Sequence, residues 1–85
     1  MKIHLRYFAS LREALGLDQE ALDLPQQIVT LADLRQHLIA RGGVWAEALA
    51  DGKILRCAIN HEMVDSNARL VDKAEIAFFP PVTGG

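Results

Sequence analysis

The residues in this sequence that are best suited to chemistry stand at its carboxyl end, where Thr83 is followed by Gly84 and Gly85. Glycine has no side chain, so a Gly-Gly end can enter a slot that is too narrow for any other residue. The α-carboxylate of Gly85 is ionised at neutral pH and is a poor electrophile. It reacts only after activation, usually as a mixed anhydride made from ATP. Because the sequence contains no phosphate-binding loop motif, we expect a partner protein to activate it.

The other reactive side chains match no catalytic or metal-binding pattern. His4, His37 and His61 share no metal-ligand spacing with one another, with Cys57 or with a carboxylate cluster, so we expect no metal site. We expect His4 on a sheet surface, His37 on the solvent side of a helix and His61 in a turn. Cys57 is in phase with apolar strand residues, which predicts a buried thiol with little thiolate character. Chemistry is therefore expected at Gly85.

The residues before Gly84 predict an extended segment. Proline lacks a backbone N–H and fixes φ near about −65°, so strand pairing should end at Pro80. Consecutive prolines favour an extended conformation, and residues 80–85 can reach roughly 20 Å. We therefore expect a folded domain over residues 1–79 and a flexible, extended C-terminal tail over residues 80–85.

Apolar residues that alternate with polar ones predict the strands of the folded domain. The predicted strands cover residues 2–8, 22–24, 55–59, 63–64 and 75–79.

Capping patterns and apolar residues at helical spacing predict the helices. Ser10–Glu13 is a capping-box pattern and Gly16 a stop signal, which together predict a short helix over residues 11–15. Thr30–Asp33 begins the main helix, which ends at Arg41–Gly43. A further turn or two of helix is expected around Val44–Leu49, with Trp45 in the core. The apolar face of the main helix comprises Leu31, Leu34, Leu38 and Ile39.

This order of elements predicts an α+β domain in which one layer of helices covers one sheet. With about five strands and one main helix, we expect a β-grasp (ubiquitin-like) fold with a mixed sheet, whose first and last strands lie parallel at its centre. Phe8 and Phe79 fall on the polar phase of those strands, so both rings would emerge where the tail leaves. Together with Pro80, Pro81 and Val82 they would form an exposed apolar patch, which indicates a partner-binding surface.

The composition excludes several classes of protein. The 85 residues, 51% of them hydrophobic and 24% charged, fit one small globular domain. A net charge of −2 without a Lys/Arg cluster argues against a nucleic-acid partner. No apolar run approaches the length of a membrane span, the first residues do not resemble a signal peptide, and a single cysteine excludes an internal disulfide. We expect a cytoplasmic protein without a membrane partner.

The string Ala77–Gly85, Ala-Phe-Phe-Pro-Pro-Val-Thr-Gly-Gly, resembles the C-terminus of the MoaD family of ubiquitin-like sulfur carriers, the small subunits of molybdopterin synthase. Tyr7–Glu13 is similar to the first strand and helix of that family, and Leu31–Leu38 to its main helix. Asp51–Asn60 resembles the segment that leads into its third strand. The match is weakest over His61–Arg69, so loop details there are less defined.

The resemblance implies a role for Gly85 in molybdenum cofactor biosynthesis. A MoeB-type activating enzyme would use ATP and Mg²⁺ to form the glycyl adenylate, and a sulfur donor protein would convert it to a thiocarboxylate (1-thioglycine). That group would donate sulfur to cyclic pyranopterin monophosphate and so form the molybdopterin dithiolene. Thr83 and Gly84 would be inserted into the partner with Gly85. The docking surface would comprise Phe8, Phe79, Pro80, Pro81 and Val82.

The resemblance also implies the assembly. Two small subunits would bind two large subunits of the MoaE type, and the pterin-binding and acid–base residues would belong to the large subunit. The chain itself would bind no cofactor. Whether it is an enzyme on its own stays open, whereas in the complex it would be the sulfur-donating subunit of a sulfurtransferase.

Three other functions fit the same residues. A thiamine-pathway sulfur carrier shares the fold and the Gly-Gly end but is normally shorter, without the helical material at residues 10–16 and around Trp45. A ubiquitin-like protein modifier would form isopeptide bonds through Gly85, after the same activation. A β-grasp interaction module would bind its partner without using its glycines.

Overall fold

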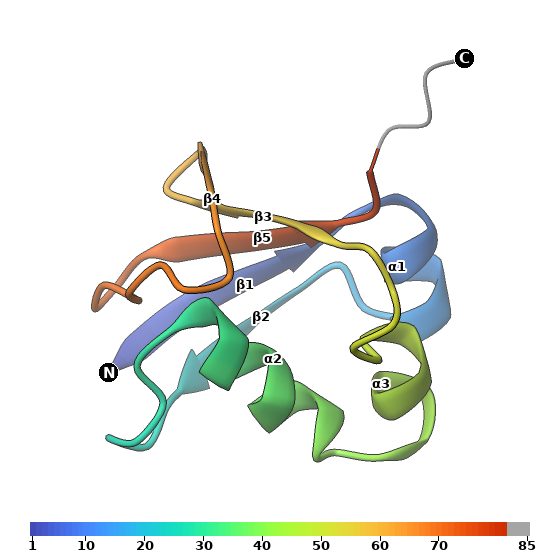
Figure 1. The fold of residues 1–85 in the computed structure, drawn as a ribbon, viewed down its shortest axis with the longest axis horizontal. Coiled ribbons are helices and arrows are strands. Elements are labelled where there is room, and N and C mark those ends of the chain that lie inside the picture. The colour runs from blue at the N-terminus through green and yellow to red at the C-terminus, as the bar shows by residue number, and fades with distance from the viewer. Residues whose placement is uncertain (82–85) are drawn as a thin grey trace.

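A computed structural model describes residues 1–81 of the chain. The predictions for Val82, Thr83, Gly84 and Gly85 lie outside the described residues, and so does most of the predicted tail. The elements, in chain order, are β1 (Lys2–Tyr7), α1 (Ala9–Leu15), β2 (Gln19–Asp23), α2 (Leu31–Ile39), α3 (Gly43–Ala48), β3 (Arg56–Ile59), β4 (Glu62–Val64) and β5 (Glu75–Phe79) (Figure 1).

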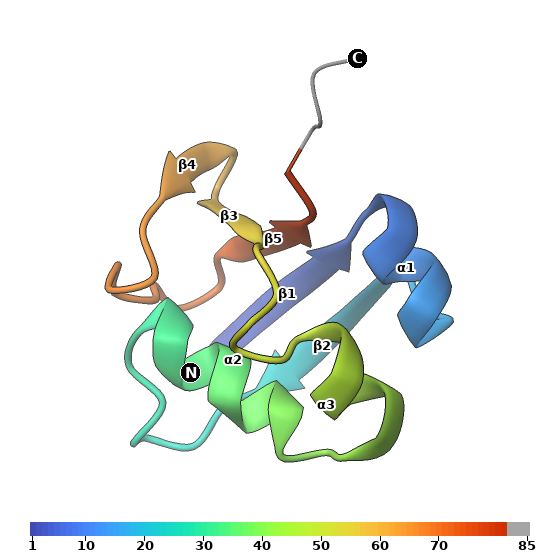
Figure 2. The same cartoon turned by 45° about the vertical axis from the view of Figure 1, so that its right-hand side comes forward.

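The strands form one five-stranded sheet in the order β2-β1-β5-β3-β4. β1 and β5 run parallel, and every other neighbouring pair is antiparallel. The helix α2 crosses beneath one face of the sheet, while α1 and α3 lie near the end at which β1 and β5 stop (Figures 1 and 2). This is the mixed sheet, helical layer and parallel central pair predicted for a β-grasp fold, and that prediction is confirmed.

The core lies between the sheet and α2, and it follows from the alternation of residues in the central strands. Leu5 on β1 and Ile76 and Phe78 on β5 have no exposed surface, nor have Leu34 and Leu38 of α2. Burying an aliphatic or aromatic side chain of this size stabilises a fold by about 1.5–3 kcal/mol. The period-2 pattern therefore fixes which face of each central strand is covered.

The main helix begins at the predicted capping box. The Thr30 hydroxyl accepts a hydrogen bond from the Asp33 backbone N–H at 3.2 Å, and the Asp33 carboxylate accepts one from the Thr30 N–H at 3.0 Å. A further bond from the Val29 N–H, at 3.0 Å, reaches the same carboxylate. These backbone donors hold the pKa of Asp33 below its usual value.

The predicted capping box of the first helix is wrong. The helix α1 begins at Ala9 with Phe8 as its N-cap, and no side chain accepts a capping hydrogen bond. Ala9 has a φ of 53°, so the backbone turns into the helix directly after β1, and Ser10 already lies in the first turn. The stop at Gly16 is confirmed, since Gly16 adopts the left-handed conformation with a φ of 67°.

Two further details differ from the sequence predictions. β2 begins at Gln19 rather than near Leu22, because it pairs with β1 from Lys2↔Asp23 to Arg6↔Gln19. His37 is half-buried on α2 rather than on its solvent side. Within residues 1–81, no helix has the length and apolar character that crossing a membrane requires.

Candidate functional site

The end of β5 fixes where the chain leaves the sheet. β5 pairs with β1 on one side and β3 on the other, so it is held along both edges. The strand ends at Phe79, as the following prolines predict, and Pro80 and Pro81 are half-buried against the body. The residues after Pro81 therefore start from a rigid point at one end of the sheet.

Phe8 and Phe79 lie together at this exit and form what we call the aromatic pair. Their ring centroids are 6.4 Å apart with an interplanar angle of 88°, an edge-to-face contact. The Phe8 N–H donates to the carbonyl oxygen of Phe78 at 3.3 Å, which ties the start of α1 to β5. Phe8 is 38% exposed and Phe79 is half-buried. The sequence prediction that the two rings emerge together is confirmed.

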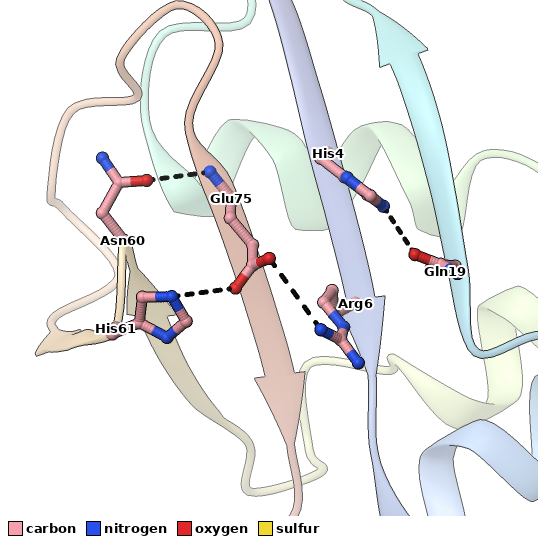
Figure 3. A network of polar contacts seen from close by, with 6 residues as sticks. All are labelled: His4, Arg6, Gln19, Asn60, His61 and Glu75. Atoms are coloured by element: carbon pink, nitrogen blue, oxygen red, sulfur yellow. Dashed lines mark hydrogen bonds and ion pairs between the residues drawn. The ribbon is translucent and has the colours of Figure 1, made fainter.

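The face of the sheet opposite α2 carries a polar network beyond the aromatic pair (Figure 3). Glu75 lies at its centre, 3.9 Å from Arg6 Nη1 and 3.4 Å from His61 Nε2. The Asn60 Oδ1 accepts a hydrogen bond from the Glu75 N–H at 3.0 Å. His4 lies toward β2 and shares a hydrogen bond of 2.9 Å with Gln19. The open face is therefore polar at its centre and apolar at the exit end.

The sequence analysis did not predict the three most exposed large apolar side chains of the described residues. Met63 on β4 is 57% exposed, and Val71, before β5, is 53% exposed. Ile54, 75% exposed, lines a groove of about 250 Å³ beside Pro80, between α1 and the connection that follows α3. The predicted strand begins at Leu55 and β3 begins at Arg56, so Ile54 precedes the strand and the alternation of the strand does not indicate whether it is buried.

The remaining reactive side chains are not assembled into a site in the described part of the chain. Burial raises the pKa of the Cys57 thiol to about 11, although the Arg35 charge opposes this rise. Cys57 is half-buried rather than buried, so the predicted burial is correct only in part, and the raised pKa agrees with the predicted low thiolate character. His4 lies on the sheet surface and His61 in a turn with a φ of 71°, as predicted. Within residues 1–81, no group of three His, Cys, Asp or Glu side chains could hold a metal ion.

A second cluster, which the sequence reasoning also missed, links the sheet to the connection between α2 and α3. The Tyr7 hydroxyl donates to Glu20 Oε2 at 2.9 Å, and Arg41 donates to both carboxylate oxygens of Glu20 at 2.9 Å. The Arg41 guanidinium also stacks 4.3 Å from the Trp45 ring centroid, and Tyr7 meets Trp45 edge-on at 5.6 Å. Burial and the Glu20 charge raise the pKa of Tyr7 far above its usual value. The polar groups of Tyr7, Glu20 and Arg41 bond to one another and Trp45 packs against two of these side chains, so the cluster holds the helices to the sheet.

Comparison with known proteins gives concordant matches. The family model described as the ThiS family matches residues 5–85. The chain is 45% identical over 83 residues to a molybdopterin synthase sulfur carrier subunit from Escherichia coli (strain K12), covering 98% of this chain and 99% of the relative.

Two solved structures share the fold over nearly their whole length. One, described as a putative molybdopterin converting factor, subunit 1, from Pyrococcus furiosus, has a TM-score of 0.77 at 25% identity, covering 96% of this chain and 99% of that one. The other belongs to a protein–protein complex of subunits 1 and 2 of molybdopterin-converting factor from Helicobacter pylori 26695. It has a TM-score of 0.67 at 26% identity and covers all of both chains.

Proposed function

The chain belongs to the ThiS family, and we propose that within it the protein is the sulfur carrier subunit of a molybdopterin synthase. The observation that carries this proposal is the 45% identity to a sulfur carrier subunit of that synthase over almost the whole of both chains. A match of this extent includes the strand that ends at Phe79 and the aromatic pair beside it. The family match also runs through Gly85.

The proposed chemistry takes place on the Gly85 carboxylate. One carboxylate oxygen attacks the α-phosphate of ATP in an activating enzyme of the MoeB type, which holds Mg²⁺, and pyrophosphate leaves. A persulfide sulfur from a donor protein then displaces AMP from the glycyl adenylate. Cleavage of the resulting S–S bond by a second thiol leaves the thiocarboxylate on Gly85. This chain supplies only the acyl group, so ATP and Mg²⁺ belong to the activating enzyme.

In the synthase, the thiocarboxylate sulfur acts as the nucleophile toward cyclic pyranopterin monophosphate. The dithiolene of molybdopterin contains two sulfur atoms, so two charged carriers are consumed for each product. Attack by the thiocarboxylate sulfur gives a thioester between Gly85 and the pterin, and water then cleaves the acyl C–S bond, which leaves the sulfur on the pterin and returns the Gly85 carboxylate. This carboxylate is unreactive and must be charged again. The large subunit, of the MoaE type, supplies the pterin-binding and acid–base groups, and two copies of each subunit form a cytoplasmic heterotetramer.

The geometry at the exit supports docking of the body outside the partner while Thr83, Gly84 and Gly85 are inserted. The chain leaves the sheet from a strand paired along both edges, and an exposed aromatic side chain lies beside the exit. Aromatic side chains of this kind are typical anchors of protein interfaces. The related complex of subunits 1 and 2 of molybdopterin-converting factor supports a large-subunit partner.

Intact-protein mass spectrometry tests the proposal. The full chain is incubated with an activating enzyme, ATP and a sulfur source, and the expected mass increase equals the replacement of one oxygen by sulfur, located on Gly85. The charged chain, mixed with the large subunit and the pterin precursor, should then return to its original mass as molybdopterin forms. A variant that lacks Gly85 should keep the melting temperature of the full chain and lose sulfur transfer.

The outcomes distinguish the other functions. A mass that never changes would contradict a carrier role and favour an interaction module. Covalent adducts on lysines of other proteins would favour a protein modifier. A thiocarboxylate that forms but is never consumed by the large subunit and the pterin would favour a carrier of the thiamine pathway.

A further inference from the structure

Two arginines flank the aromatic pair on the open face of the sheet. The Arg6 guanidinium carbon lies 5.4 Å from the Phe8 ring centroid, and its side chain is 43% exposed. Arg56, on β3, is exposed and lies directly opposite Phe79 in the antiparallel register with β5. Side chains directly opposite in such a pair project from the same face about 4.5–5.5 Å apart at Cβ. Because β5 lies between β1 and β3, the aromatic pair has one cation on each side.

Arg6 and Arg56 form few ion pairs or hydrogen bonds within the described part of the chain. The only carboxylate near Arg6 in the described structure is Glu75, at 3.9 Å, and His61 contacts the same carboxylate. The Arg6 Nε is buried and has no hydrogen-bond acceptor within residues 1–81, so a partner can reach this guanidinium only through its terminal nitrogens. Arg56 forms no ion pair with any residue of that range.

Two other arginines of the chain are engaged internally. Arg41 holds the Glu20 carboxylate with two hydrogen bonds of 2.9 Å. Arg35 donates to the backbone carbonyls of Leu49, Ala50 and Lys53. Arg6 and Arg56 are not held in this way, and the exposed parts of their guanidinium groups lie beside the aromatic pair.

We propose that Arg6 and Arg56 select the partner, and that the surface that receives the aromatic pair is an apolar recess with carboxylates on both sides. The inference rests on the proposed function, because the large synthase subunit is that partner. The chain carries a net charge of −2, so an acidic partner surface would be repelled by the chain as a whole, whereas Arg6 and Arg56 would attract it at this face. Charges arranged in this way set the orientation of docking and the association rate.

Binding of full-length variants to the purified large subunit tests the inference. Arg6→Glu and Arg56→Glu should each weaken binding by about tenfold, mainly through slower association, because each replaces an attraction by a repulsion. The double variant should be weaker still, and its binding should strengthen rather than weaken as the salt concentration rises, because salt then screens a repulsion. Arg6→Gln and Arg56→Gln, which remove the charge without reversing it, should have smaller effects.

Arg69→Glu is the matched control, since it makes the same change in net charge. Arg69 is exposed, and its backbone forms an isolated antiparallel β-bridge with Thr30 at the start of α2, away from β1 and β3. This variant should therefore bind like the unmodified chain. Phe8→Ala removes the exposed ring of the aromatic pair and leaves both arginine charges in place. Circular dichroism and the melting temperature confirm that every variant is folded. A large subunit with a recess carboxylate changed to lysine should restore binding to Arg6→Glu or Arg56→Glu.

Three results would overturn the inference. Unchanged binding of both reversals, with binding lost in Phe8→Ala, would leave the proposed function intact and remove the role of the arginines. Equal loss in Arg69→Glu would show a general charge effect. If the reversals weakened binding to the activating enzyme but not to the large subunit, the arginines would recognise the activating enzyme instead of the large subunit. If the unmodified chain neither binds the large subunit nor forms a thiocarboxylate, the proposed function fails as well.

Discussion

Replacing Tyr7 with phenylalanine removes one hydroxyl from the cluster that joins the sheet to the helices. Tyr7 is 1% exposed, and its ring would keep its contact with Trp45, at 5.6 Å between centroids. The hydrogen bond to Glu20 Oε2, at 2.9 Å, would be lost, while Arg41 would still donate to both oxygens of that carboxylate. The substitution therefore isolates one buried hydrogen bond to a charged acceptor.

The expected loss in the free energy of unfolding at neutral pH is about 1–2 kcal/mol. A hydrogen bond to a charged group contributes about 1.5–3 kcal/mol, and the retained Arg41 contact places this one toward the lower end. For a domain of this size, each kcal/mol lost from the free energy of unfolding lowers the melting temperature by about 4–8 °C. Tyr7→Phe should therefore melt roughly 4–16 °C lower than the unmodified chain.

The difference between the two proteins should shrink at high pH. The folded state raises the pKa of Tyr7, so the stability linked to it is present below the unfolded value of 10.0 and is lost as pH rises above that value. Phenylalanine does not titrate, so the variant has no such loss. The Cys57 thiol titrates in the same range, from 9.0 to about 11, but it is present in both proteins and cancels in the difference.

Urea unfolding at pH 7 and at several values above pH 10 measures the difference directly. Tyr7 is the only tyrosine of the chain, so the absorbance of tyrosinate reports its titration without interference. In the folded protein that absorbance should appear only when the chain unfolds, and in urea it should appear near the ordinary pKa. A variant as stable as the unmodified chain at pH 7, or a difference that stays constant with pH, would refute the role given to this hydrogen bond.

Two further predictions concern the thiol and the main helix. Because burial raises the pKa of Cys57 to about 11, its reaction with a thiol reagent near neutral pH should be roughly a hundredfold slower in the folded chain than in urea, and equal rates in both would contradict the burial of the thiol. Thr30→Ala removes the acceptor of the Asp33 N–H and should lower the free energy of unfolding, measured in urea, by about 1 kcal/mol. Thr30→Ser keeps a hydroxyl and should retain most of the stability. Equal losses in the two Thr30 variants would show that the hydroxyl does not cap α2.

Patterns that repeat along one element were sufficient to predict most of the fold. The period-2 alternation of β1 and β5 identifies the buried faces, and it also places Phe8 and Phe79 out of phase with them. The capping box of α2 needs only residues three positions apart, which a sequence displays directly. The same kind of pattern failed at Ser10, because a strand that turns directly into a helix shifted the N-cap to Phe8.

Features that depend on contacts between distant elements could not be predicted. Tyr7, Glu20, Arg41 and Trp45 meet only after β1, β2 and the α2–α3 connection have packed together. The position of Arg56 beside Phe79 depends on the register between β3 and β5, which no local pattern defines. For the site, the pairing of the two rings and the end of the strand at Pro80 are confirmed, whereas the roles of Val82 to Gly85 stay predictions.

The central position of β5 determines the order in which the protein can fold as it is synthesised. Until residues 75–79 have been made, β2-β1 and β3-β4 are separate halves without a strand between them. The pairing from His4↔Glu75 to Tyr7↔Phe78 joins the earliest strand to the latest, a contact between distant parts of the chain that forms slowly. A nascent chain that stops before residue 75 lacks the centre of its sheet and also lacks the residues that follow Pro80. A chain released before residue 75 therefore cannot complete its core, so a chain that folds has already made the strand that leads to Pro80.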